Sequence, residues 1–290
     1  MVFLKALTLR DVPRVLSIAG TDPTGGAGIQ ADLKSIAALG GYGMAVVTSL
    51  VAQNTRGVRS VHTPPASFLT EQLDAVSDDV AIDAVKIGML GDVATIAVVR
   101  EWLHRARPPL LVLDPVMVAT SGDRLLAADA ETALRELVGM ADLVTPNLPE
   151  LAVLVDGPIA VDWPAALEQG RRLSMSCGTV VLVKGGHLSA EFSPDALVDA
   201  TGQLDGADGG AVEFVSPRVA TRNTHGTGCS LSSAVATAMA RTGDWAGAVR
   251  QAKDWLQDAL TSADELEVGQ GNGPINHFHL LWTAAGSITR

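Results

Sequence analysis

Aromatic residues, basic residues and cysteines are all scarce in this 290-residue chain. Aromatic side chains make up only 4% of the residues although hydrophobic ones make up 47%, so we expect an aliphatic core, as in proteins whose helices cover both faces of a parallel sheet. The 21 Lys and Arg against 32 Asp and Glu give a formal net charge of −11. This charge argues against nucleic-acid or anionic-membrane partners, because both need basic patches. A phosphate ligand would have to bind to a few local positive groups or to backbone N–H groups.

Two cysteines, Cys177 and Cys229, lie far apart in the sequence without metal-ligand spacing. We expect them to be reduced thiols of a cytoplasmic protein. No window approaches the ~18 uncharged apolar residues of a membrane span, and the first residues lack the apolar stretch of a signal peptide. We predict an N-terminal extension at residues 1–13 and a single domain at residues 14–290.

Short apolar runs rich in β-branched residues alternate with longer helical patterns along the whole chain. The predicted strands are Arg14–Ala19, Met44–Leu50, Ala84–Ile87, Leu110–Leu113, Leu143–Thr145, Val180–Val183 and Val212–Val215. The predicted helices are Ile29–Leu39, Ser67–Asp78, Val93–Arg105, Ala128–Leu137, Trp163–Met175, Cys229–Arg241 and Trp245–Ala263. This alternation predicts βαβ units in an α/β fold with a mainly parallel central sheet. The segment 200–210, rich in Gly and Asp, predicts a surface loop or hairpin tip.

Parallel sheets of this kind bind ligands outside the carboxyl ends of their strands. The residues that follow the predicted strands there are Gly20, Met89, Asp114, Asn147 and Lys184. We therefore expect the chemistry of the protein at that edge of the sheet.

The first of two glycine loops, residues 20–28, separates the first strand from a helix. Gly26, Gly28 and Ala31 match a dinucleotide-binding fingerprint, but the acidic residue expected about 20 residues later is absent. No Gly-Lys-Ser/Thr follows, so the loop is not a P-loop. A tight strand-to-helix turn explains it equally well. Asp32, one turn into the helix, has a plain interpretation as a favourable charge for the helix dipole.

The second glycine loop, residues 223–230, runs directly into an alanine-rich helix. Successive unpaired N–H groups of Gly226, Thr227 and Gly228 would point to one place, which predicts an anion site that needs no extra positive side chain. Cys229 would lie in the first turn, where the helix dipole lowers the pKa of a thiol and favours the thiolate. It would then act as a base for an alcohol or orient its hydroxyl. The alternative is a buried, inert cysteine.

Charged and polar side chains at the other strand ends have two interpretations each. Asp114 is either a Mg²⁺ ligand, as phosphoryl transfer requires, or a turn residue before proline. Asn147 and Glu150 have the spacing of a capping box, which does not exclude contact with a metal or a phosphate. Lys184 leaves a buried strand, where its charge predicts a phosphate partner unless it reaches the surface.

Two histidines close to the carboxyl end, His277 and His279, would be the only hint of a transition-metal site. No carboxylate spacing supports such a site, so we expect packing or surface roles.

Eight of these segments, in order, resemble the hydroxymethylpyrimidine kinase branch of the ribokinase superfamily. They are residues 17–23, 25–32, 51–55, 86–90, 114–117, 145–150, 183–187 and 223–230. The resemblance implies a three-layer α/β/α domain that uses ATP and Mg²⁺. It also implies which residues hold the acceptor ring: Gly20, Asp32, Val51, Gln53, Met89 and Val116.

The resemblance further implies roles on the nucleotide side. ATP would contact Asn147, Lys184, Thr224 and the amides of residues 226–228, with Mg²⁺ near Asp114 and Glu150. Gln53 is informative because an amide presents both a donor and an acceptor, which suits an aminopyrimidine, and related pyridoxal kinases commonly lack it. Most ribokinase relatives carry Asp where this chain has Cys229, so a thiolate, a water molecule and the transferring phosphate all stay open as proton acceptors.

The resemblance implies an ATP-dependent kinase of thiamine biosynthesis that phosphorylates 4-amino-5-hydroxymethyl-2-methylpyrimidine and then its monophosphate. Three alternatives remain: a pyridoxal kinase, a nicotinamide-dependent oxidoreductase built on Gly26 and Gly28, and a pyrimidine-sensing module without turnover. Because large α/β enzymes often form symmetric dimers, we also expect a homodimer.

Overall fold

The computed structural model describes residues 7–118, 125–188, 191–202, 204 and 210–288. An eight-stranded sheet in the order β10-β9-β8-β7-β6-β5-β1-β2 runs through its centre. Six neighbouring strands are parallel: β2 (Tyr42–Val47), β1 (Arg14–Ala19), β5 (Ala84–Ile87), β6 (Leu111–Leu113), β7 (Leu143–Val144) and β8 (Val180–Lys184). Two antiparallel strands complete one side, β9 (Phe192–Val198) and β10 (Ala211–Pro217).

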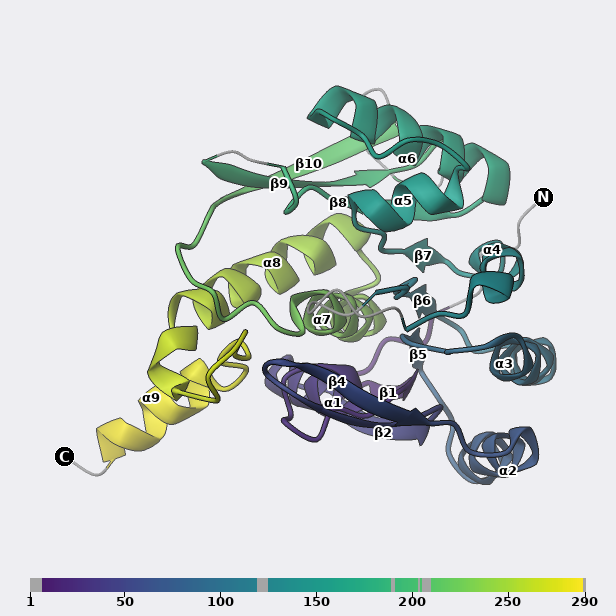
Figure 1. Cartoon of the computed structure of the whole chain (residues 1–290), viewed down its shortest axis with the longest axis horizontal. Helices are drawn as coiled ribbons and strands as arrows, with labels where there is room; N and C mark the ends of the chain where they lie inside the picture. Colours follow the sequence, from purple (N-terminus) through teal and green to yellow (C-terminus); the bar gives the residue numbers. More distant parts are fainter. Residues whose placement is uncertain (1–6, 119–124, 189–190, 203, 205–209, 289–290) are drawn as a thin grey trace.

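Helices cover both faces of this sheet, which confirms the predicted three-layer α/β/α architecture (Figure 1). One face is packed by α1 (Gly28–Ala38), α7 (Thr227–Thr242) and α8 (Trp245–Thr261). The other face is packed by α2 (Ala66–Ser77), α3 (Val93–Ala106), α4 (Glu131–Val138), α5 (Leu148–Leu154) and α6 (Trp163–Cys177). Short 3₁₀ turns at Ala128–Ala130 and Ala263–Leu266 and a last helix, α9 (His279–Ile288), complete the described elements.

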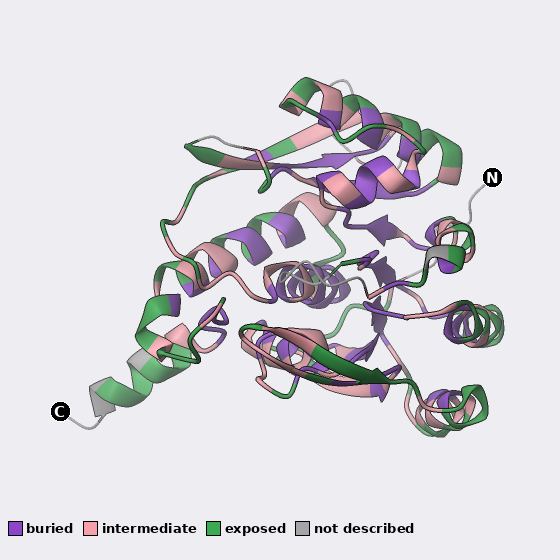
Figure 2. Cartoon of the chain, in the orientation of Figure 1, coloured by how far each residue is buried: buried purple, intermediate pink, exposed green. Residues whose placement is uncertain are grey.

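The core consists of two aliphatic layers, one on each face of the sheet. The central strands are almost completely buried, so their sequences read as continuous apolar runs rather than alternating ones (Figure 2). Helix α7 is buried along most of its length because its serines and alanines let it lie close to the sheet between α1 and α8. In the part of the chain that the structure describes, no helix combines the length and apolar character needed to cross a bilayer.

A separate two-stranded hairpin, β3 (Leu50–Asn54) and β4 (Gly57–His62), leaves the sheet after β2. The predicted strand Met44–Leu50 was wrong here, since β2 ends at Val47 and β3 begins at Leu50. Thr48 and Ser49 turn the chain: the Thr48 hydroxyl donates to the Met89 carbonyl (2.7 Å), and Thr21 N–H donates to the Ser49 carbonyl (2.9 Å). These bonds attach the start of the hairpin to the ends of β1 and β5.

The predicted hairpin tip at 200–210 lies in the sequence between the antiparallel strands β9 and β10. Residues 203 and 205–209 of this loop lie outside the described residues, as do residues 1–6 of the predicted N-terminal extension. Of that extension the structure describes residues 7–13, in which Arg10 pairs with Asp83 (3.1 Å).

Candidate active site

A cavity of about 890 Å³ lies along the carboxyl edge of the parallel strands. Five of the six residues predicted to hold a ring line it, namely Gly20, Val51, Gln53, Met89 and Val116. All nine residues predicted for phosphate, proton transfer and metal line it as well: Asp114, Asn147, Glu150, Lys184, Thr224, Gly226, Thr227, Gly228 and Cys229. Segments that are far apart in the sequence therefore meet at the carboxyl edge of the sheet, as predicted.

Asp32 is the exception, since it is not part of the described lining of the cavity. Its carboxylate is fully buried and forms an ion pair with Lys86 (2.8 Å), which is also fully buried. Hydroxyl groups of Ser17 and Ser233 donate to the same carboxylate at 2.6 and 2.8 Å. These partners occupy Asp32, and its contact with a ring stays a prediction.

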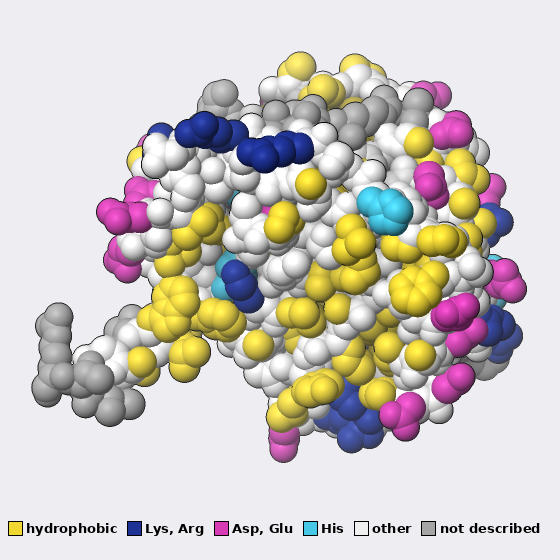
Figure 3. Space-filling model, turned by 60° about the horizontal axis from the view of Figure 1, so that its bottom comes forward, with side chains coloured by type: hydrophobic (Ala, Val, Ile, Leu, Met, Phe, Trp, Pro, Cys, Tyr) yellow, Lys and Arg dark blue, Asp and Glu magenta, His cyan; other side chains and the backbone are white. Residues whose placement is uncertain are grey.

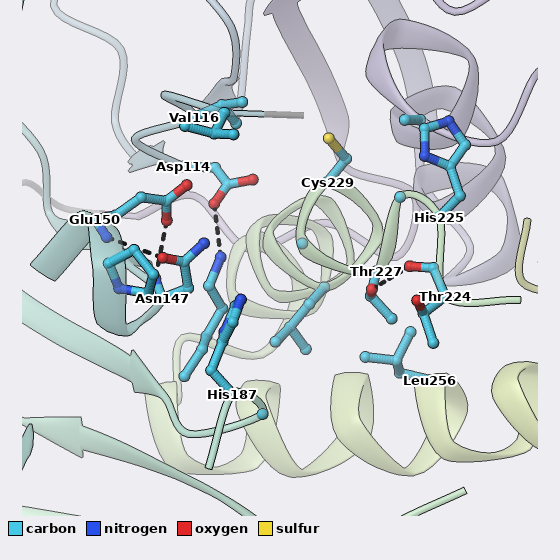
Figure 4. A pocket seen from close by; sticks show the side chains of 18 of the residues that line it. Asp114, Val116, Asn147, Glu150, His187, Thr224, His225, Thr227, Cys229 and Leu256 are labelled. Atoms are coloured by element: carbon cyan, nitrogen blue, oxygen red, sulfur yellow. Dashed lines mark hydrogen bonds and ion pairs between the residues drawn. The ribbon is translucent and has the colours of Figure 1, made fainter. Parts of the chain in front are cut away.

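The start of α7 forms one wall of the cavity. Gly226 is the N-cap residue at φ 80°, and no side chain caps the helix. A Cβ on Gly226 would collide with the carbonyl oxygen of Gly26, so only glycine lets the two glycine loops approach this closely. The backbone N–H and the hydroxyl of Thr227 both donate hydrogen bonds to the Thr224 carbonyl (3.3 and 2.5 Å; Figure 4). The N–H groups that follow in the first turn of α7 have no side-chain cap, and such groups at a helix start can bind an anion.

Lys184 and Asp114 meet opposite this helix start (Figure 4). Lys184 Nζ donates to Asp114 Oδ1 at 2.9 Å, and Thr145 Oγ1 donates to the same oxygen at 2.9 Å. Burial opposes both charges, yet the neighbouring Lys184 and Lys86 charges lower the pKa of Asp114, and the Asp114 and Glu150 carboxylates raise the pKa of Lys184. The pair is therefore ionised at neutral pH.

Asn147 and Glu150 form the predicted capping box at the start of α5, which confirms the structural interpretation of that spacing. Glu150 N–H donates to Asn147 Oδ1 and Asn147 N–H donates to Glu150 Oε2, both at 2.9 Å. Burial and the nearby Asp114 charge raise the pKa of Glu150 to about 7, against the opposing Lys184 charge. A cation near these two carboxylates would favour the ionised form of Glu150.

Cys229 corrects one expectation from the sequence. We predicted a thiolate, but burial raises the pKa of the Cys229 thiol to about 11, and the Asp32 and Asp114 charges add to this, against the nearby Lys86 charge. The reason is that the thiol lies in a protein interior that holds carboxylates as well as a lysine. At neutral pH Cys229 is a neutral thiol that can orient a hydroxyl group rather than act as a standing base.

Sequence reasoning missed three charged pairs around this cavity. Besides Lys86 with Asp32, they are His225 with Asp22 (2.8 Å) and Lys253 with Asp195 (2.6 Å). Their partners lie between 54 and 203 residues apart in the sequence. No local spacing could have revealed them.

The fold and the edge at which the cavity opens place the chain in a class, the ribokinase-like small-molecule kinases. The ADP complex of Bacillus subtilis pyridoxal kinase superposes on it with a TM-score of 0.83 and 30% sequence identity, covering 93% of this chain and 99% of that one. The shared fold extends over the whole relative.

The chain belongs to the phosphomethylpyrimidine kinase family, whose profile matches residues 22–276. Hydroxymethylpyrimidine/phosphomethylpyrimidine kinase of Escherichia coli is 52% identical over 92% of this chain and 98% of its own length. A thiamine biosynthesis multifunctional protein of Corynebacterium glutamicum is 54% identical over 92% of this chain. The chain spans about a third of that larger relative, 34% of its length.

Proposed function

We propose that this protein is an ATP-dependent kinase that phosphorylates 4-amino-5-hydroxymethyl-2-methylpyrimidine and then its monophosphate, giving the diphosphate used for thiamine. One observation carries the proposal. A Cβ on Gly228 would lie 3.4 Å from Lys184 Nζ and 3.6 Å from Asp114 Oδ2, so a helix start, a cation and a carboxylate converge inside the cavity that Gln53 also lines. Such convergence suits a phosphoryl group in transfer.

The phosphate side of the cavity would bind ATP through Lys184 and the first-turn amides of α7. Phosphoryl transfer needs little covalent chemistry from the protein, and positioning with charge neutralisation supplies most of the rate enhancement. Thr224 and Asn147 would border the phosphates from either side, since both line the cavity. The ADP complex of the pyridoxal kinase relative supports the use of an adenine nucleotide.

Mg²⁺ would be held by Asp114 and Glu150. The structure describes no group of three or more His, Cys, Asp or Glu side chains suited to a metal ion, so two carboxylates would act together with phosphate oxygens and water, as is usual for Mg²⁺. The residues fit this ion: Thr145 and Lys184 both donate to Oδ1 of Asp114, whereas Oδ2 lies on the side of Gly228. When bound, Mg²⁺ would neutralise charge on the phosphate oxygens.

The acceptor side would hold the pyrimidine ring between Val51, Met89 and Val116, with Gln53 at its edge and Gly20 beneath it. Val51 and Met89 are almost completely buried, which gives the ring an apolar surface. Gly20 leaves room for the Met89 side chain, because a Cβ there would lie 2.5 Å from the methionine methyl group. The Gln53 amide would pair with the ring nitrogen and amino group.

As the acceptor oxygen forms its bond to the γ-phosphorus and the bond to ADP breaks, the hydroxyl proton of the acceptor would pass to an oxygen of the transferred phosphoryl group. Cys229 is a neutral thiol at physiological pH, since its pKa is raised to about 11, and so lacks the ionised form that a resident base needs. It would hold the acceptor hydroxyl at the start of α7, the position from which this oxygen attacks.

The test is ADP release with the pyrimidine alcohol, its monophosphate and pyridoxal side by side. We expect turnover with the first two and a much lower kcat/KM with pyridoxal. Pyridoxal is the second candidate because of the likeness to the Bacillus subtilis pyridoxal kinase. Preference for pyridoxal would refute the proposed acceptor, and binding of the pyrimidine without ADP release would favour the sensing module.

A homodimer and a cytoplasmic location remain predictions. The face of the molecule seen in Figure 3 exposes hydrophobic side chains, and Leu50, Val61, Tyr42 and Phe68 are among the exposed large hydrophobic residues of the described chain. Exposed apolar patches of this kind support association. Light scattering during size-exclusion chromatography should give twice the chain mass for the parent protein and a lower mass for Leu50→Asp.

A further inference from the structure

Asp22 lies in the first glycine loop and belongs to none of the roles assigned so far. Its carboxylate is fully buried. Oδ1 accepts from the backbone N–H and the hydroxyl of Thr24 (2.9 and 2.7 Å), and Oδ2 accepts from Gly26 and Ala27 N–H (3.1 and 2.8 Å). These bonds give residues 22–27 one fixed conformation.

The same carboxylate also reaches the second glycine loop. His225 Nε2 donates to Asp22 Oδ2 at 2.8 Å, across 203 residues of sequence. The His225 ring packs on Gly26, since a Cβ there would lie 2.6 Å from His225 Cδ2. His225 immediately precedes Gly226, the N-cap residue of α7. Asp22 therefore attaches the helix start that would bind phosphate to the loop that borders the acceptor.

The side-chain amide of Gln53 also interacts with Asp22 and favours its ionised form. Burial opposes ionisation of Asp22, but hydrogen bonds from His225, Gln53 and Thr24 hold its pKa well below the ordinary range. An ionised carboxylate can accept hydrogen bonds but cannot donate them, so this interaction favours the orientation in which the NH₂ end of the Gln53 amide faces Asp22. The amide oxygen of Gln53 is then left for the cavity that this residue lines. An oxygen in that place accepts from a ring amino group.

We propose that Asp22 is a positioning residue whose single buried carboxylate fixes the amide orientation of Gln53 at the ring and the placement of His225 before the phosphate-binding helix start. This inference rests on the proposed function. The carboxylate sets the distance and orientation between the two ends of the acceptor, its ring edge and its hydroxyl, without contacting either.

A purely structural role for Asp22 makes a different prediction. Loss of a structural clasp lowers stability and weakens binding of both substrates, whereas loss of positioning acts mainly on the acceptor. Most of the ATP binding should persist, because Lys184 is held by Asp114 and Asn147 by Glu150 rather than by Asp22. Asp83 offers a matched control: its carboxylate accepts from Arg14 and Arg10 at the opposite end of β1. Its pKa is likewise lowered, by the Arg14 and Arg10 contacts against burial.

The experiment measures kcat and KM for the pyrimidine alcohol and for ATP in the parent protein, Asp22→Asn and Asp83→Asn, with a melting curve for each. For Asp22→Asn we expect kcat/KM for the alcohol to fall on the order of a hundredfold, with a change of at most about twofold in the KM for ATP. Asp83→Asn should melt at a lower temperature with both KM values unchanged.

A double-mutant cycle checks that the effect passes through Gln53. In a Gln53→Ala background, Asp22→Asn should raise the KM for the alcohol by much less than it does alone, because the amide that it orients is gone. If the folded Asp22→Asn cannot be obtained, His225 supplies the test. His225→Gln keeps an N–H donor for Asp22 and should retain most of the turnover that His225→Ala loses.

The outcomes separate the two proposals. A parent protein that releases no ADP with either pyrimidine overturns the proposed function and this inference together. An active parent whose Asp22→Asn variant matches it, or whose KM for ATP rises as much as that for the alcohol, overturns the inference alone. Equal activity of His225→Gln and His225→Ala has the same consequence.

Discussion

His277 should make the free energy of unfolding fall as the pH drops below the pKa that this histidine has in the unfolded chain. Its ring is almost completely buried and lies within hydrogen-bond distance of Ser230 Oγ (2.9 Å). Burial and the Lys34 charge lower the pKa of His277 to about 3, against a hydrogen bond that the ring donates to the backbone of Ile275. A buried imidazole of this kind stays neutral in the folded protein.

The sign follows from proton binding in the two states. Between pH 6.5 and pH 3 the unfolded chain binds a proton at His277 and the folded chain does not. The contribution of the neutral His277 to the free energy of unfolding is therefore fully present above pH 6.5 and is lost as the pH falls through this window. With an unfolded pKa of about 6.5, the loss between pH 7 and pH 5 is about 2 kcal/mol. This loss hardly depends on the pKa of His277 in the folded protein, since any folded pKa of about 4 or lower gives nearly the same result.

Urea unfolding at pH 7 and pH 5, followed by far-UV circular dichroism, measures this loss. Fluorescence is less suitable because the His277 ring lies 6.1 Å from that of Trp255. His277→Gln keeps a partner for Ser230 and should lose about 2 kcal/mol less than the parent between the two pH values. His62→Gln, at the exposed end of β4, should behave as the parent does. Equal losses in the parent and His277→Gln would refute the reasoning.

Three further predictions concern the cavity. Gly226→Ala places a methyl group against the Gly26 carbonyl at φ 80°, so we expect a lower melting temperature and a loss of ATP binding by calorimetry. The difference in thiolate absorbance between the parent and Cys229→Ser should rise with a midpoint near pH 11, and a midpoint below pH 8 would restore the thiolate base. Lys184→Gln removes the cation beside Asp114 and should lower kcat on the order of a hundredfold, whereas unchanged turnover would contradict its role.

The positions of the parallel strands and the edge that binds ligand could be read from the sequence because both depend on local patterns. Buried parallel strands are continuous apolar runs, and the residues after them, from Gly20 to Lys184, necessarily meet at one edge. The capping box of Asn147 and Glu150 is equally local, and the structure confirms it. Where three or four neighbouring residues determine the structure, sequence reasoning succeeded.

The hairpin β3–β4 and strand β9 were not predicted because polar residues, glycine or proline interrupt their apolar residues. The side chains of β4 are largely exposed, since this hairpin stands away from the core. Strand β9 contains Pro194 and Asp195, which indicate a loop when read alone. In the structure β8 pairs only as far as Asp195, so Pro194 lies beyond the end of that ladder, where its missing N–H costs nothing.

The charged pairs explain how a chain with a net charge of −11 can bind a polyanion. Lys86, Lys184 and Lys253 each contact an aspartate, at 2.8, 2.9 and 2.6 Å, so none contributes an uncompensated positive charge to an empty site. Attraction for phosphate must then begin with the amides at the start of α7. In the proposed mechanism, a phosphate that took Lys184 as its partner would leave the Asp114 carboxylate to a cation, which would couple binding of the anion to binding of Mg²⁺. The acidic composition would then be compatible with phosphoryl transfer, because Lys184 and Asp114 would exchange partners together.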